Sequence, residues 1–137
     1  IFGFGYAGGI VGMTNLVSNA GVVASDVTAV GTARHGQAAC SYGGDKGIFG
    51  FGDDGSACDI TNLVSNAGVV ASDVTGVGTA RSALAATQYG DDKGIFGFGN
   101  DGSVCDITNL VSNSGVVASD VTGVGSARQF LAGCSFN

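Results

Sequence analysis

Short stretches of apolar and small residues, separated by turn residues, run along the whole chain. Four of them follow one another in its middle part: residues 80–88, 93–98, 105–112 and 116–121. Between them lie clusters of Gly, Asp, Asn and Ser at residues 90–92, 100–103 and 113–115. Short apolar runs bounded in this way are typical of β-strands, and these turn residues tolerate the backbone conformations of tight turns. The pattern therefore predicts four short antiparallel strands joined by tight turns.

The same pattern occurs three times. The segment IFGFG begins at Ile1, Ile48 and Ile95, which are 47 residues apart, and TNLVSNAGVVASDVT at Thr14 and Thr61 recurs almost unchanged later in the chain. Self-similarity at this period indicates a stack or ring of supersecondary units. We therefore treat the chain as a single repeat array, residues 1–137, with repeats 1–47, 48–94 and 95–137.

Composition favours a β-unit over a helical one. The chain has 26 glycines and no proline, with 45% hydrophobic and 12% charged residues, which indicates a compact, turn-rich chain rather than a disordered one. Two-helix repeats of similar length need Leu and Ala at helical spacing, which is absent here. Four strands per repeat match one blade of a β-propeller. The expected fold is all-β, with three four-stranded antiparallel blades per chain.

One segment resembles a known repeat. Residues 79–102, TARSALAATQYGDDKGIFGFGNDG, resemble the core of a kelch-type repeat, in which an Arg opens a small-residue strand and an aromatic strand ends in glycine. The following TNLVSNSGVVASD, with Asn109 and Asp120, is similar to the stretch after the glycines in that family. The chain departs from the pattern because it has no tryptophan and no diglycine after the aromatic strand. The resemblance implies a β-propeller of radially packed blades.

The two ends carry complementary parts of one repeat. The chain opens on the second strand of a unit and closes on residues 128–137, which align with residues 34–43 and supply the first strand of the next unit. Propellers use roughly four to eight blades, so three are too few to close a ring. We expect the terminal strand of one chain to complete the first blade of another, as a six-bladed homodimer or a filament. Alternatively, the chain is part of a longer array. The residues expected in this exchange are Ile1, Phe2, Phe4, Arg128, Phe130, Cys134 and Phe136.

Charged residues also recur with the period of the repeat. An aspartate is followed eight residues later by an arginine in all three units: Asp26, Asp73 and Asp120, with Arg34, Arg81 and Arg128. They could form a ring of ligand-binding charges. We prefer the interpretation that each Asp braces a loop and each Arg ties neighbouring blades, because identical spacing suits structure better than catalysis.

Other candidate chemistry is weak. The loops at residues 53–56 and 100–103 could suggest calcium, but the first repeat has no carboxylate there, so we interpret them as turns. His35 is the only histidine and has no ligand partner at suitable spacing, so we predict a surface residue and no zinc site. We expect free thiols rather than an intrachain disulfide framework. A disulfide between two chains is an alternative for Cys134. No cofactor or catalytic constellation is predicted.

Charge limits the partners. A net charge of −6 with five Lys and Arg argues against nucleic acid and anionic membranes, which need a basic patch. No apolar run reaches the roughly 20 residues of a membrane-spanning helix.

Two functions remain. We favour a non-enzymatic structural or assembly protein, extracellular or on a cell or virion surface, over a propeller that binds a glycan or peptide once per blade. The phenylalanine pairs of the IFGFG segments alternate along one strand, and we interpret them as blade-to-blade core rather than sugar platforms.

Overall fold

All regular structure in the computed structural model is β-strand. It describes residues 1–28 and 30–136, so Ala29 and Asn137, the last residue of the predicted terminal strand, lie outside the described residues. No helix occurs in the described part. The strands are β1 Phe2–Tyr6, β2 Ile10–Asn15, β3 Ala38–Tyr42, β4 Lys46–Asp53, β5 Ala57–Val64, β6 Ala85–Tyr89, β7 Lys93–Asn100 and β8 Val104–Val111.

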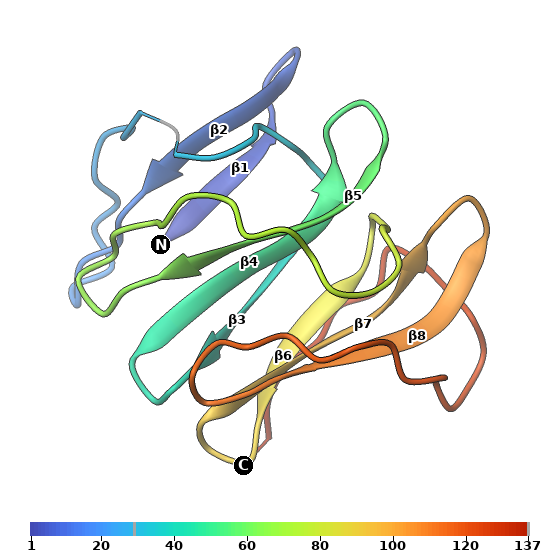
Figure 1. Cartoon of the computed structure of the whole chain (residues 1–137). Coiled ribbons are helices and arrows are strands. Elements are labelled where there is room, and N and C mark those ends of the chain that lie inside the picture. The colour runs from blue at the N-terminus through green and yellow to red at the C-terminus, as the bar shows by residue number, and fades with distance from the viewer. Residues whose placement is uncertain (29, 137) are drawn as a thin grey trace.

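The strands form three small antiparallel sheets. Sheet 1 has the order β1-β2, sheet 2 the order β3-β4-β5, and sheet 3 the order β6-β7-β8. Figure 1 shows the sheets following one another in chain order, with sheet 2 between the other two. The register repeats, since Cys40 pairs with Ile48 in sheet 2 as Thr87 pairs with Ile95 in sheet 3. The predicted all-β character is therefore confirmed.

The predicted fourth strand is not a continuous strand. Residues 116–121 form isolated bridges with β8, Val111↔Val117 and Thr108↔Val121, instead of a continuous ladder, and sheet 2 has the same arrangement. The turn at residues 112–115 brings the segment back along β8, and Ala118 N–H donates to the carbonyl of Leu110 at 2.8 Å. Between these bridges, Ser119 and Asp120 have no backbone partner in β8, and the Asp120 side chain accepts hydrogen bonds from Asn109 and Thr79. In place of four strands, sheets 2 and 3 thus each have three strands and a bridged segment.

A β-bulge changes the direction of the paired phenylalanines. The register of β4 against β5 shifts between Gly50 and Gly52, where Phe51 has a φ of 61°, and β1 and β7 have equivalent shifts. In a regular strand, Phe49 and Phe51 would share one face. The extra residue at the bulge breaks that alternation. Phe49 therefore packs on Phe4 of sheet 1, whereas Phe51 packs on Phe96 of sheet 3.

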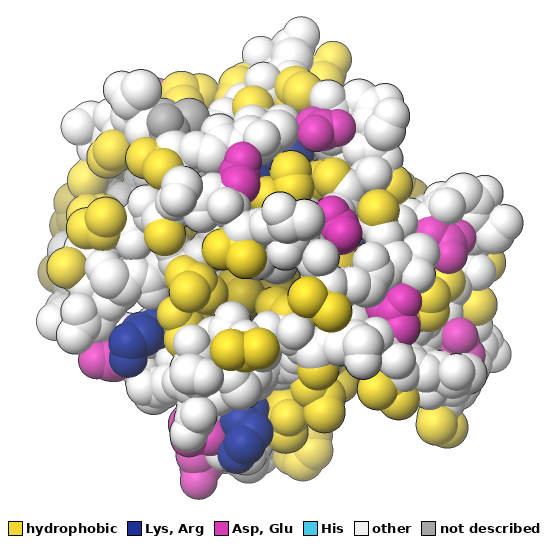
Figure 2. All heavy atoms as spheres, viewed as in Figure 1, with side chains coloured by type: hydrophobic (Ala, Val, Ile, Leu, Met, Phe, Trp, Pro, Cys, Tyr) yellow, Lys and Arg dark blue, Asp and Glu magenta, His cyan; other side chains and the backbone are white. Residues whose placement is uncertain are grey.

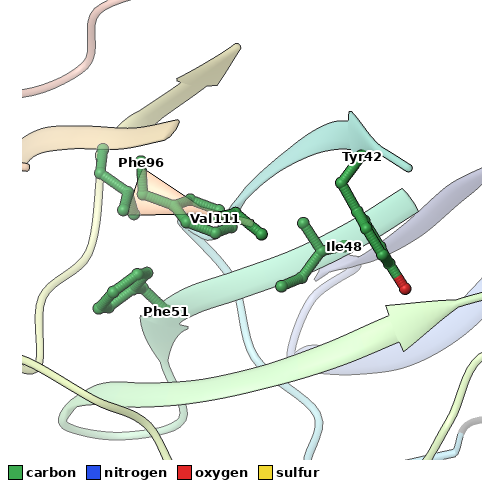
Figure 3. Close-up of a cluster of buried hydrophobic side chains, with 6 residues drawn as sticks. Tyr42, Ile48, Phe51, Phe96 and Val111 are labelled. Carbon is green, nitrogen blue, oxygen red and sulfur yellow. The ribbon is translucent and has the colours of Figure 1, made fainter. Parts of the chain in front are cut away.

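The core lies between the sheets. The larger cluster joins sheets 2 and 3, whose side chains point toward one another in Figure 3. Its buried members are Tyr42, Ile48, Phe51, Leu84, Phe96 and Val111. A smaller cluster joins sheets 1 and 2 through Phe49, Val64 and Val70, with Phe4 packed against them. Sheets 2 and 3 each bury apolar side chains by stacking on the preceding sheet, which is the expected behaviour of a repeat unit.

The chain after sheet 3 contains no strand as far as Phe136. Phe130 N–H donates to the carbonyl of Ala83 at 2.8 Å, and Gly133 lies close to the carbonyl of Ala86. The segment therefore runs beside β6. In the same way, β6 lies beside β3 of the preceding sheet. It is aligned with a first strand but has no second strand to pair with in the described chain.

We predict that Gly76→Ala destabilises the fold. An ideal Cβ at Gly76 would lie 1.8 Å from the backbone oxygen of Asp59, which cannot move without disturbing β5. Overpacking of this kind costs about 1 to 3 kcal/mol. Urea denaturation should show this loss, whereas the control Gly9→Ala, whose Cβ would meet nothing within 4 Å, should change little. Equal stability of the two variants would contradict the close approach at Gly76.

Candidate functional site at the junctions between sheets

A buried arginine lies at the centre of each complete junction, by which we mean the contact between two neighbouring sheets. Arg81 lies in the connection from sheet 2 to sheet 3 and is 0% exposed. It donates from Nε to the carbonyl of Phe98 at 2.9 Å and from NH1 to the carbonyl of Thr79 at 3.1 Å. Its NH2 donates to Oδ1 of Asn109 at 2.6 Å. The arginine thus fastens the connecting segment to two strands of sheet 3.

The same arginine also contacts the preceding sheet. Its guanidinium lies 4.1 Å from the centre of the Phe51 ring, in a cation–π arrangement. Its backbone carbonyl accepts a hydrogen bond from Gly52 N–H of sheet 2 at 2.9 Å. Arg81 therefore binds sheet 3 through its guanidinium edge and sheet 2 through its guanidinium face and backbone.

The acceptor Asn109 is held in turn by Asp120. Asn109 is buried and donates from Nδ2 to the carbonyl of Ala118 and to Oδ1 of Asp120, at 3.0 and 2.9 Å. Asp120 accepts from the backbone N–H of Thr79 at 3.0 Å and from its hydroxyl at 2.7 Å. The side-chain amide of Asn109 thus binds both the positive charge of Arg81 and the negative charge of Asp120. Asp120 in turn binds Thr79, which lies in the same connecting segment as Arg81.

The junction between sheets 1 and 2 has the same geometry. Arg34 is also 0% exposed and donates to the carbonyls of Phe51 and Thr32 at 2.8 and 3.1 Å. It donates to Oδ1 of Asn62 at 2.6 Å and lies 4.2 Å from the centre of the Phe4 ring. Thr32 and Asn62 both donate to Asp73, as their equivalents do to Asp120.

Burial and hydrogen bonding shift the pKa values of these groups. Burial lowers the pKa of Arg81, partly offset by nearby Asp120, but the ordinary arginine value is so high that the group stays charged at neutral pH. Burial acts to raise the pKa of Asp120, yet the bonds from Asn109 and Thr79 and the charge of Arg81 lower it overall. Arg34 and Asp73 show the same directions. Each junction therefore holds opposite charges in their ionised forms.

The third Asp and Arg do not meet. Arg128 is exposed, and among residues 1–28 and 30–136 its guanidinium donates only to the carbonyl of Ser126, at 3.0 Å. Asp26 lies on sheet 1 and accepts only from Asn15, at 2.8 Å, within the same described ranges. Of the six repeated charges, four belong to complete junctions and two lie at opposite ends of the molecule.

Sequence reasoning did not assign a role to Asn62, Asn109, Thr32 or Thr79. The signal was present, because each asparagine interrupts an apolar strand at the repeat period. A polar side chain at such a position needs a buried partner. The arginine eight residues after each aspartate is that partner, but it binds the asparagine of the following sheet.

The remaining residues expected in strand exchange lie on sheet 1 and on the segment after sheet 3. Ile1 and Phe2 are exposed on sheet 1, where Phe4 already packs on sheet 2. Phe130, Cys134 and Phe136 are exposed on the segment after sheet 3. No contact joins these two groups within the described chain.

Apolar clefts also repeat between the sheets. A cleft of about 260 Å³ lies between sheets 2 and 3, lined by Leu63, Val74, Val77 and Val116 among others. Its counterpart between sheets 1 and 2, about 200 Å³, is lined by Leu16, Val27, Val30 and Val69. Figure 2 shows hydrophobic side chains gathered over the centre of one face, with acidic side chains between them.

The loops considered for calcium bind their own backbone. Oδ1 of Asp53 accepts from Gly55 N–H and Oδ1 of Asn100 from Gly102 N–H, both at 2.9 Å. These are Asx turns, in which the side-chain oxygen is engaged locally. In the part of the chain that the structure describes, no three His, Cys, Asp or Glu side chains gather as a metal site.

The histidine and three of the four cysteines are partly or fully buried, and Cys134 is exposed. His35, predicted at the surface, is half-buried, with Nδ1 3.0 Å from the carbonyl of Asp53. All four cysteines are free. Burial raises the pKa of the Cys40 thiol to about 11 and also raises those of Cys58 and Cys105. These three thiols stay protonated at neutral pH and are poor nucleophiles.

Comparison with known proteins adds no family: no protein-family model matches the chain, and no curated protein matches it significantly. Within the described residues, no helix has the length and apolar character to cross a membrane. The kelch-like resemblance therefore stays a prediction from the sequence.

We predict that Arg81→Lys lowers the free energy of unfolding by about 2 to 4 kcal/mol. The Nε and NH2 groups of arginine donate to two acceptors at once, the carbonyl of Phe98 and Oδ1 of Asn109. The single ammonium group of lysine cannot reach both, so a buried acceptor loses its donor. Urea denaturation of dilute protein measures the loss. The matched control is Arg128→Lys, which changes an exposed member of the same repeat position and should cost less than about 0.5 kcal/mol. Similar losses in both variants would show that the buried contacts of Arg81 do not stabilise the fold.

Proposed function

We propose that this protein is a non-enzymatic structural protein whose copies associate head to tail, as a kelch-like propeller array. Two chains would close a six-bladed ring, and a rotation that does not close would give a filament. The same proposal places the assembly outside the cell or on a cell or virion surface.

One observation carries the proposal: the two end sheets present opposite halves of a junction that is complete twice inside the chain. Arg34 and Arg81 each bind the following sheet, and Arg128 has the same position after sheet 3. Asn15 and Asp26 of sheet 1 have the positions of the acceptors Asn62 and Asp73.

The strand edges support the same arrangement. β4 and β7 each pair with a strand on both sides, whereas β1 pairs only with β2 among the described strands. The register of sheet 2 would set residues 132–134 of one copy against Ile1, Phe2 and Gly3 of another. Addition of a strand to an open edge forms backbone hydrogen bonds that need no particular side chains.

Binding of a glycan or peptide is the second candidate, because the apolar cleft between sheets recurs with the repeat. It is less favoured because the clefts are lined mainly by Val, Leu and Gly and carry few polar groups to orient a sugar.

We predict that the purified 137-residue chain self-associates. Sedimentation velocity over a concentration series should show species larger than the 13.3 kDa chain, and negative-stain electron microscopy should show rings or fibres. Rings would indicate closed dimers and fibres an open array. A single 13.3 kDa species at every concentration would contradict the proposed function.

A further inference from the structure

Sheet 1 exposes side chains that the other sheets bury. Phe2 is 62% exposed, whereas its equivalents Phe49 and Phe96 are 5% and 0% exposed. Val17 and Val23 are likewise exposed, although the valines at the same positions pack against the phenylalanine in sheets 2 and 3. In the complete junctions, the covering element is the preceding sheet. The outer face of sheet 1 therefore matches a surface that a preceding repeat covers.

Polar groups on this face also match the junction. Asn15 donates from Nδ2 to Ala24 and Asp26, as Asn62 does to Ala71 and Asp73. Within residues 1–28 and 30–136, Oδ1 of Asn15 accepts no hydrogen bond, although Oδ1 of Asn62 accepts one from Arg34. The sheet 1 face thus carries the amide of Asn15 and the carboxylate of Asp26. In the complete junction, the equivalent amide accepts from the guanidinium of Arg34 and the equivalent carboxylate accepts from the hydroxyl of Thr32.

Sheet 3 presents the complementary donor. The guanidinium of Arg128 lies 3.9 Å from the centre of the Phe98 ring, and its carbonyl accepts from Gly99 N–H at 3.0 Å. These are the contacts that Arg81 makes to sheet 2. Arg128 therefore has its half of a junction in place, and its Nε and NH2 groups donate no hydrogen bond within residues 1–28 and 30–136.

A cavity of about 260 Å³ lies beside Arg128, which we call the sheet 3 cavity. Its lining includes Ile95, Gly97, Phe98, Arg128 and Leu131. One repeat earlier, the equivalent residues are Ile48, Gly50, Phe51, Arg81 and Leu84. Three of these, Ile48, Phe51 and Leu84, share a buried cluster with Phe96.

Glycine allows an aromatic ring to approach in the complete junction. A Cβ on Gly50 would lie 2.6 Å from Cζ of Phe96, so the ring rests directly on the glycine backbone. At Gly97, the nearest atom to such a Cβ is Cγ2 of Thr108 at 3.4 Å, in the same sheet. The sheet 3 cavity therefore has the shape and lining of a phenylalanine site.

We propose that Phe2 of a second copy of this chain occupies the sheet 3 cavity. In the same contact, Arg128 donates to Oδ1 of Asn15 and to the carbonyl of Phe4 of that copy, and Ser126 donates to its Asp26. This assignment rests on the proposed head-to-tail association and names the residues that make it specific. Charge favours it, because the contact would bring the exposed Arg128 near the carboxylate of Asp26, as Arg81 lies near Asp120 on the other side of Asn109.

A row of backbone hydrogen bonds joins the segments that precede neighbouring sheets, and it would continue across the contact between two copies. Ala83 N–H donates to the carbonyl of Gly36, and Phe130 N–H donates to the carbonyl of Ala83, at 2.7 and 2.8 Å. These residues share one repeat position. Gly36 N–H of the second copy would continue the row by donating to the carbonyl of Phe130.

The test uses one variant for each face: Phe2→Ala removes the inserted ring and Arg128→Ala removes the donor. Both side chains are exposed in the single chain, so circular dichroism should show an unchanged fold. Each substitution should weaken self-association by about thirtyfold or more, as expected for a central anchor. Val104→Ala is the control, because this exposed valine of β8 lines none of the clefts, and the equivalent position of the preceding repeat already carries an alanine, Ala57. It should associate like the unmodified chain in sedimentation velocity.

Mixing the two variants tests the pairing of the faces. The Phe2→Ala chain keeps an intact sheet 3 face, and the Arg128→Ala chain keeps an intact sheet 1 face. An equimolar mixture should therefore form a heterodimer through one normal junction, although each variant alone stays monomeric at that concentration.

Three results would overturn the assignment. Self-association of both variants at the strength of the unmodified chain would refute these contacts and leave the proposed function standing. A mixture that stays monomeric would show that the two faces do not pair. An unmodified chain that never associates would refute both the assignment and the proposed function.

Discussion

The buried arginine is the contact on which the arrangement of sheets depends. A guanidinium removed from water must have its donors satisfied and its charge compensated. Sheet 3 and the connecting segment meet both needs for Arg81, and the backbone carbonyl of the same residue binds Gly52 of sheet 2. Its fork reaches two strands of sheet 3, while its flat face covers Phe51 of sheet 2. Apolar packing alone is non-directional and would tolerate sliding of one sheet over another. The polar chain from Arg81 to Asp120 therefore fixes the stacking geometry that the aromatic core stabilises.

This contact has a direction, which has consequences beyond the single chain. Each arginine binds the sheet that follows it, so a junction has a donor face and an acceptor face that differ from each other. A surface of this kind cannot satisfy itself through a two-fold axis with the same patch on both sides, and it leads instead to rings or open arrays. The bulge at Phe51 also makes the two faces of a sheet different. Because of it, Phe49 packs on the preceding sheet and Phe51 packs on the following sheet.

The repeat made much of the fold predictable. Its period and turn residues indicated the strands that became β6, β7 and β8, with shifts at their ends. The predicted fourth strand was wrong in form, since residues 116–121 contact β8 at isolated bridges, and the Asp120 side chain within this segment binds Thr79 and Asn109. The bulge could not be expected, because a phenylalanine with a φ near 60° goes against local preference and is held there by packing between sheets. The period likewise singled out Arg81 and Asp120, but their link through Asn109 depends on a contact 28 residues away in the sequence.

The most direct test of the head-to-tail junction is a cross-link that reports its register. Cys40 pairs with Ile48 in sheet 2, so the same register between copies sets Cys134 opposite Ile1. Cross-strand partners are close enough for a disulfide after small adjustments. After mild oxidation of Ile1→Cys, mass spectrometry should find a disulfide between the introduced thiol and Cys134 of another copy. The double variant Ile1→Cys/Cys134→Ser should give no such product. An associated Ile1→Cys protein that forms no cross-link, or forms one only to a different cysteine, would contradict the junction described above.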